Sequence, residues 1–280
     1  MRIETATDGE TGADAAAVAD HTDISRDAFL GGAVMLRQPR QGYRAGLDAV
    51  ILAASIAVPP GDSPRRLLDV GAGVGTVGLC AAVRLPGLEV TMVEQSPRLC
   101  ALAAMNITEN QLGARVRVVE QDIVSLRSPA QQHLIDNHFD VVVSNPPFYE
   151  VANHRPSPHV LKADSHAMPS AGLDGWLRFM ARMTKAGGSA MMIHRADYLP
   201  AMLAAFAPRF GALTLMPLYP RLGEPASRVI LRGIKGSRAP LKIAPGICLH
   251  AMDNRFNPIV DKVLKTPAAL DLDGGATRDV

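Results

Sequence analysis

The stretch Val141–Tyr149, Val-Val-Val-Ser-Asn-Pro-Pro-Phe-Tyr, joins a β-branched run to two prolines and two aromatic residues. Prolines have no amide hydrogen for a strand ladder, so we expect a buried strand that stops at Asn145. The Asn145 side-chain oxygen and the Pro146 carbonyl can accept both hydrogens of an amino group, and Phe148 offers a stacking face. We interpret Asn145, Pro146, Pro147 and Phe148 as a catalytic turn. By themselves, these residues are also typical of a turn that only ends a strand.

A glycine-rich turn, Asp69-Val-Gly-Ala-Gly-Val-Gly-Thr76, joins the first strand of the predicted sheet to a helix. Gly71, Gly73 and Gly75 let a ligand approach the backbone closely and leave helix-start amides free. A dinucleotide-binding fingerprint would have glycine in place of Thr76. The glycines, preceded by Asp69, resemble the first motif of S-adenosylmethionine-dependent methyltransferases.

Two further acids follow the next two predicted strands. Glu94 ends the second strand, where a carboxylate can accept hydrogen bonds from both hydroxyls of a ribose. Asp122 follows the third strand, where it can accept from an adenine amino group. Either acid alone is also explained as a helix N-cap. Together with the glycine turn they predict a cofactor site at the carboxyl edge of the sheet.

The elements that position these residues alternate between strand and helix, which predicts an α/β fold: a Rossmann-like, doubly wound, mostly parallel sheet of seven strands. Ser96-Pro97 is typical of a helix start, and we expect another helix over 173–186, ended by Gly187-Gly188. The predicted strands are 66–70, 89–94, 116–120, 139–144, 190–194, 213–218 and 228–234. We expect four segments: a disordered acidic arm (1–24), an N-terminal cap (25–62), the main domain (63–265) and a flexible tail (266–280).

Charge and composition are uneven along the chain. Residues 1–30 carry seven acids and two arginines, so the other 250 residues carry 27 basic and 20 acidic side chains. A basic body is compatible with a nucleic-acid partner and equally with an ordinary solvated surface. Three scattered cysteines, no apolar run of about 18 residues and no signal peptide favour a cytoplasmic protein without a membrane span. The histidines show no metal-ligand spacing, and we expect no metal.

Beyond the catalytic turn, the N-terminal region resembles one family in particular. Phe29-Leu-Gly-Gly32, Gln38-Pro39, Gly42-Tyr-Arg-Ala-Gly46 and Asp48-Ala-Val50 are similar to the N-terminal signature of the bacterial valine-tRNA adenine N6-methyltransferases. The resemblance covers roughly residues 27–265. It implies the class I methyltransferase fold, S-adenosylmethionine as methyl donor, and adenine N6 of a tRNA as acceptor.

The motifs indicate the methyl donor and the amino-group chemistry, but they leave several acceptor molecules open. Release-factor glutamine methyltransferases and ribosomal guanine N2-methyltransferases share the catalytic turn, and a small-molecule N-methyltransferase or a non-catalytic binding module are further alternatives. Arg44, within the N-terminal signature, is a candidate to bind the cofactor carboxylate. Candidate RNA contacts are His154, Arg155, His159, Lys162, Arg228, Arg232, Lys235, Arg238 and Lys242.

Overall fold

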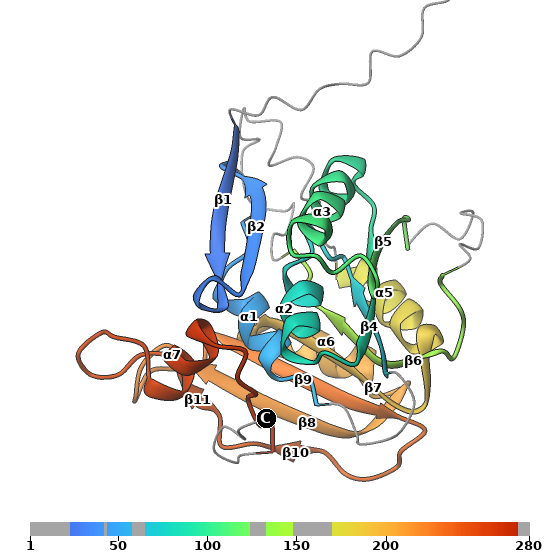
Figure 1. Cartoon of the computed structure of the whole chain (residues 1–280). Helices are drawn as coiled ribbons and strands as arrows, with labels where there is room; N and C mark the ends of the chain where they lie inside the picture. The colour runs from blue at the N-terminus through green and yellow to red at the C-terminus, as the bar shows by residue number, and fades with distance from the viewer. Residues whose placement is uncertain (1–22, 42–43, 58–64, 124–132, 148–169, 274–280) are drawn as a thin grey trace, which may run out of the picture.

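The computed structural model describes residues 23–41, 44–57, 65–123, 133–147 and 170–273 (Figure 1). A central sheet has the strand order β10-β8-β9-β7-β6-β3-β4-β5, with β11 paired to β8. Its strands are β3 (Arg65–Val70), β4 (Leu88–Glu94), β5 (Val116–Glu120), β6 (Phe139–Ser144), β7 (Thr184–Arg195), β8 (Phe210–Tyr219), β9 (Arg228–Lys235), β10 (Lys242–Ile243) and β11 (Ile247–Cys248).

Strands β3 to β7 are parallel, whereas β9 runs antiparallel to both β7 and β8. The chain runs outward from β3 through β4 to β5 and then returns to the other side of β3 as β6. The strand order therefore reverses between β3 and β6, and the loops after these two strands meet at the carboxyl edge, where ligands bind in such sheets. This confirms the predicted doubly wound fold. The seven expected strands are β3 to β9, and the two-residue strands β10 and β11 extend the sheet.

Helices cover both faces of the sheet (Figure 1). Residues of β6 show why, because Val141 and Val143 belong to one apolar core and Val142 to the other. Alternate side chains of a strand point to opposite faces, so both faces need a cover. Packed on the first face are α1 (Leu47–Ala54), α2 (Thr76–Arg84), α3 (Pro97–Glu109) and α7 (Pro258–Lys265); on the second are α5 (Ser170–Met183) and α6 (Leu199–Phe206).

An antiparallel hairpin precedes the sheet and stands beside α3 (Figure 1). It consists of β1 (Ile24–Phe29) and β2 (Val34–Pro39), joined by the short 3-10 helix η2 (Leu30–Gly32). A second short 3-10 helix, η3 (Ala196–Tyr198), leads into α6. The sequence does not predict β1, because the alternating polar residues of this strand give no clear apolar signal.

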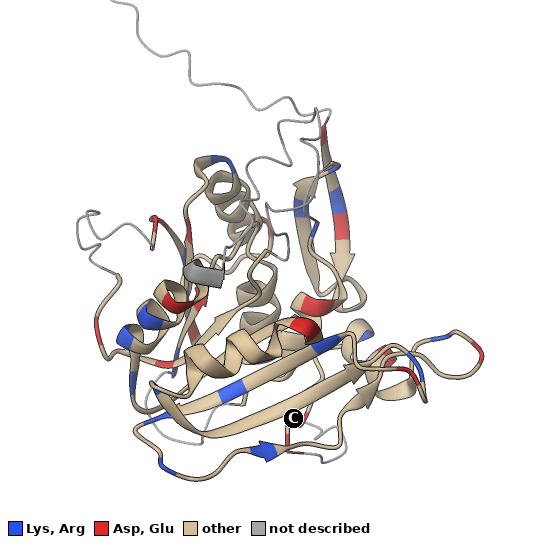
Figure 2. Ribbon diagram, turned by 180° about the vertical axis from the view of Figure 1, so that it is seen from behind, with Lys and Arg blue, Asp and Glu red and all other residues tan. Residues whose placement is uncertain are grey.

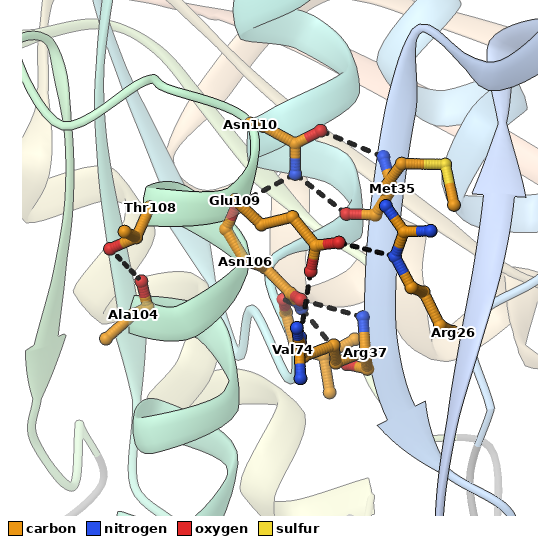
Figure 3. Close-up of polar contacts among 9 residues, drawn as sticks. All are labelled: Arg26, Met35, Arg37, Val74, Ala104, Asn106, Thr108, Glu109 and Asn110. Carbon is orange, nitrogen blue, oxygen red and sulfur yellow. Dashed lines mark hydrogen bonds and ion pairs between the residues drawn. The ribbon is translucent and has the colours of Figure 1, made fainter.

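Two side-chain amides on α3 hold the hairpin (Figure 3). Asn110 accepts a hydrogen bond from the Met35 amide at 2.8 Å and donates to the Met35 carbonyl at 2.7 Å. Asn106 accepts from the Arg37 amide at 2.7 Å and donates to the Arg37 carbonyl at 3.1 Å. The two asparagines lie one helical turn apart and pair with alternate residues of β2, so they replace a neighbouring strand along this edge. Asn106 also donates to the Val74 carbonyl at 2.9 Å, which ties the hairpin to the glycine turn.

The helix predicted over 173–186 ends earlier, at Met183. The glycine pair after it does not terminate the helix. Instead, the register between β6 and β7 shifts from Phe139↔Thr184 to Val141↔Ser189, so Gly187 and Gly188 lie in a bulge of β7. A Cβ on Gly188 would lie 2.9 Å from the Asp140 carbonyl oxygen, so the bulge requires glycine where the two backbones approach.

The expectation of a flexible tail from residue 266 is wrong for the part that the structure describes. Leu270 and Leu272 are buried in the first core, and the Leu270 amide donates to the Ala54 carbonyl at 2.9 Å. Burial of these two leucines offsets the conformational entropy lost when the segment is ordered over the end of α1. Cys80 and Cys100 are buried and form no disulfide. Among the described helices, none combines the length and the apolar character needed to cross a membrane.

Candidate active site

A cavity opens at the carboxyl edge of the sheet, where the glycine turn and the Asn145 turn meet. The loops after β3, β4, β5 and β6 form most of it, and the base of the hairpin closes one side through Pro39, Gln41 and Ala45. Trp176 of α5 lines the side next to the Asn145 turn. The cavity thus collects residues from sequence positions 39 to 176 at the reversal of strand order.

The three glycines of the turn have different roles, although each has a positive φ. Gly71 and Gly73 line the cavity, and a Cβ on Gly73 would meet nothing within 4 Å, so that position is open to a ligand. Gly75 is not part of the cavity lining. A Cβ there would lie 2.9 Å from the Met92 sulfur, and a φ of 91° favours glycine, so Gly75 serves the shape of the turn and its packing on β4.

Asp69 lines the cavity and is 1% exposed. Its Oδ2 accepts a hydrogen bond from the Gly78 amide at 2.9 Å, in the first turn of α2. The helix lacks a side-chain cap at Gly75, so Asp69 satisfies one of its free amides from the preceding strand. Burial raises the pKa of Asp69 to about 7; the Gly78 amide opposes this rise and the nearby Glu94 adds to it. Asp69 therefore takes up or releases a proton near neutral pH.

Glu94 also lines the cavity and organises the loops around it. Its Oε2 accepts from the Gly73 amide at 2.9 Å, and its Oε1 accepts from the amides of Gln95 at 2.9 Å and Ser96 at 3.0 Å. One carboxylate thus fixes both the glycine turn and the start of α3. Because a carboxylate has about four lone-pair sites, Glu94 retains acceptor capacity for a ligand hydroxyl.

The polar group from the third loop is Gln121, not the predicted Asp122. Gln121 is 9% exposed and lines the cavity together with Ile123, whereas Asp122 is exposed and lies outside the lining. The Gln121 side chain donates to the Asp122 carbonyl at 3.1 Å, and its buried Oε1 has no partner among the described residues. The strand alternation that buries Val119 carries on to Gln121, and this signal was available in the sequence.

Arg44, predicted to bind the cofactor, lies outside the cavity lining. Its guanidinium pairs with Asp27 at 2.8 Å and donates to Ser25 at 2.9 Å and to the Pro39 carbonyl at 3.2 Å. Gln38 completes this network, because it donates to Asp27 and accepts from the Ala45 amide. Arg44 therefore braces the base of the hairpin, which carries cavity residues, and does not itself face the cavity.

The catalytic turn is described as far as Pro147. Asn145 and Pro147 line the cavity, and Pro146 between them is buried. The Asn145 side chain is half-buried at the end of β6. Phe148 lies outside the described residues, as do the basic residues predicted between 154 and 162. The structure thus brings Asn145 to the same cavity as Asp69, Gly71, Gly73 and Glu94.

The basic residues of β9 do not form a surface for nucleic acid at this edge. Arg228 lies at the carboxyl edge but pairs with Asp48 at 2.9 Å, while Arg232 pairs with Asp273 at 2.8 Å. Lys235 is at the opposite end of β9 and donates to the Thr184 carbonyl at 2.7 Å. Figure 2 shows the basic segments scattered among acidic ones over this side. Arg238 and Lys242 follow Lys235 and also lie outside the cavity lining; Lys242 pairs with Thr214 in the middle of β8.

Comparison with known proteins finds methyltransferases among the relatives of this chain. Residues 49–163 match the methyltransferase small domain family. A tRNA1(Val) (adenine(37)-N6)-methyltransferase of Flavobacteriaceae bacterium (strain 3519-10) is 31% identical over 41% of this chain and 46% of its own length. A release factor glutamine methyltransferase of Geobacter sulfurreducens is 35% identical over 46% of this chain and 47% of its own length. The matched region thus spans about half the length of these curated relatives.

A solved structure matches this chain over a larger share of its length. It is described as a predicted O-methyltransferase from Agrobacterium tumefaciens and is 31% identical, with a TM-score of 0.65 over 80% of this chain and 98% of its own. The fold and the cavity define an S-adenosylmethionine-dependent methyltransferase of class I. Within that class, residues 49–163 match the methyltransferase small domain family, whose cofactor is S-adenosylmethionine.

The cavity residues fit this cofactor. Glu94 has acceptor capacity for the ribose hydroxyls, and the unpartnered Gln121 Oε1 beside Ile123 suits the amino group of an adenine. The open side of Gly73 admits a ligand against the backbone. Gly71 and Asn145 line the rest of the cavity and would border the methionine portion of a bound cofactor.

Proposed function

We propose that the protein methylates an exocyclic amino group, with adenine N6 in a tRNA as its acceptor. The observation that carries the proposal is the position of Asn145 and Pro147, which line the same cavity as the glycine turn and Glu94. The tRNA adenine N6-methyltransferase relatives support adenine as the acceptor. An enzyme of this kind acts in the cytoplasm, where tRNA is modified.

Such an amino nitrogen is a poor nucleophile because its lone pair is delocalised into the ring. The Asn145 side-chain oxygen and the Pro146 carbonyl accept its two hydrogens, which favours a tetrahedral nitrogen with a localised lone pair. Bound S-adenosylmethionine supplies an electrophilic methyl group. No strong base is needed, because the proton leaves only after attack. Phe148 is assigned the stacking face for the base, a contact typically worth about 1–3 kcal/mol.

The amide of a glutamine side chain is the second candidate acceptor, because the release factor relative carries that name. It presents the same chemistry, an NH2 group on a planar carbon, and so does guanine N2. A hydroxyl acceptor, which the name of the solved O-methyltransferase relative implies for that protein, has a single hydrogen and leaves one of the two acceptors in the turn unused. The pair of acceptors therefore favours an amino nitrogen.

A methyl-transfer assay with tritiated donor tests the acceptor. The substrates are bulk tRNA that lacks the modification, ribosomal RNA and a purified release factor, each with wild-type protein and with Asn145→Ala. We expect label in N6-methyladenosine of the tRNA, and little label with the variant. Label only in the release factor would refute the tRNA proposal while preserving amino-group chemistry. Label on a hydroxyl oxygen would refute both.

A further inference from the structure

Trp176 is the only tryptophan of the chain, and it shares an apolar helical spacing with Leu173, Leu177 and Met180. The structure packs Trp176 against the second apolar core, and its ring also lines the cavity beside the glycine turn. A Cβ on Gly71 would lie 2.7 Å from the Trp176 Cζ2, so the ring occupies the space that glycine leaves free. Trp176 thus reaches the cavity from α5, on the face of the sheet opposite to α2 and α3.

The indole also begins a chain of hydrogen bonds between the two loops of the site. Its Nε1 donates to the Ser144 Oγ at 3.0 Å, and this hydroxyl donates to the Val70 carbonyl at 2.8 Å. Ser144 is fully buried. Val70 directly precedes Gly71, and Ser144 directly precedes Asn145. The two hydrogen bonds therefore connect the residue before the glycine turn to the residue before the Asn145 turn.

We propose that Trp176 is a positioning residue for methyl transfer, which sets the Asn145 turn relative to the glycine turn through Ser144 and forms one side of the methionine part of the cavity. The indole uses the acceptor capacity of the Ser144 hydroxyl, so that its single hydrogen points to Val70 and the ends of β3 and β6 are held together. Transfer is sensitive to such spacing, because small displacements of reacting groups reduce rates strongly. The cavity contact depends only on donor binding, whereas the positioning role rests on the proposed function.

The placement is testable without an acceptor. A single tryptophan gives one indole signal in a ¹⁵N–¹H spectrum of uniformly labelled protein. We expect this signal to shift on saturation with S-adenosylhomocysteine, and to move in Ser144→Ala without ligand, because that variant removes the acceptor. An indole signal unchanged by ligand, with binding established by calorimetry, would overturn the cavity contact. A signal unchanged in Ser144→Ala would overturn the hydrogen bond.

Kinetics test the positioning role. Trp176→Phe keeps an aromatic ring and removes the N–H, and Ser144→Ala removes the shared hydroxyl. We expect each variant to lower kcat about five- to tenfold while the dissociation constant of the donor changes less than about threefold. The double variant should lose no more than either single one, because both remove one connection.

Phe179→Leu is the matched control, since Phe179 lies on the same helix in the second core, outside the cavity lining. It should lower the melting temperature with kcat unchanged. Multiplicative losses in the double variant, or a Trp176→Phe variant that resembles Phe179→Leu, would overturn the positioning role. If the wild-type protein methylates none of the tested acceptors, the proposed function and the positioning role are both refuted, and the spectra still decide the cavity contact.

Discussion

Replacing Asp69 with asparagine changes the pH dependence of stability in a direction that the structure defines. The folded carboxyl has a pKa of about 7, against an ordinary value of 3.8. The folded protein therefore retains a proton that the unfolded chain releases, and stability falls as pH rises from about 4 to about 7. The difference of about 3 pH units corresponds to roughly 4 kcal/mol, at 1.36 kcal/mol per unit. An asparagine side chain does not titrate, so the variant would show no such loss.

The assay is urea unfolding of wild-type protein and Asp69→Asn at pH 5 and pH 8, without cofactor. The asparagine oxygen can still accept from the Gly78 amide. Any weakening of that hydrogen bond therefore changes the free energy of unfolding by the same amount at both pH values. We expect the stability of the variant relative to wild type to rise between pH 5 and pH 8 by up to about 3 kcal/mol. An unchanged difference would refute the raised pKa of Asp69.

The same carboxyl links donor binding to pH. S-adenosylmethionine carries a sulfonium and an ammonium charge, and a cation in the cavity favours the ionised form of Asp69. The affinity of wild-type protein for the donor should therefore increase from pH 6 to pH 8, with proton release on binding that calorimetry in two buffers detects. Asp69→Asn should bind more weakly at pH 8 and show no such proton release. Proton release that persists in the variant would assign it to another group.

Three further substitutions separate the roles of other residues. Asn145→Ala should lower turnover at least tenfold with nearly unchanged donor affinity by calorimetry, and a comparable loss of affinity would indicate a structural turn. Asn106 is fully buried, and Asn106→Ala leaves three backbone groups without this partner, so it should cost about 2–3 kcal/mol by urea unfolding; the partly exposed Asn110→Ala should cost about 1 kcal/mol, and equal costs would contradict the burial argument. Gly71→Ala should abolish donor binding because its Cβ has no room, while Gly73→Ala should weaken binding modestly by backbone strain alone.

The sequence alone specifies the order of the main strands and helices, because apolar periodicity and turn residues are local signals. It also determined the chemistry of the loops: glycines that free the backbone, and an asparagine fixed by two prolines. Since parallel strands share a carboxyl edge, their end residues were expected to meet, and Asp69, Gly71, Glu94 and Asn145 do.

Which side chains at that edge face the cavity depends on tertiary packing. Gln121 lines it in place of Asp122, and Arg44 braces the hairpin. These outcomes depend on side-chain direction and on partners far away in the sequence, such as Asp27. Trp176 is the clearest case, because its helical spacing indicates packing against the core but not its place in the cavity lining. Its contact with Gly71 and Ser144 exists only because α5 packs across the ends of β3 and β6.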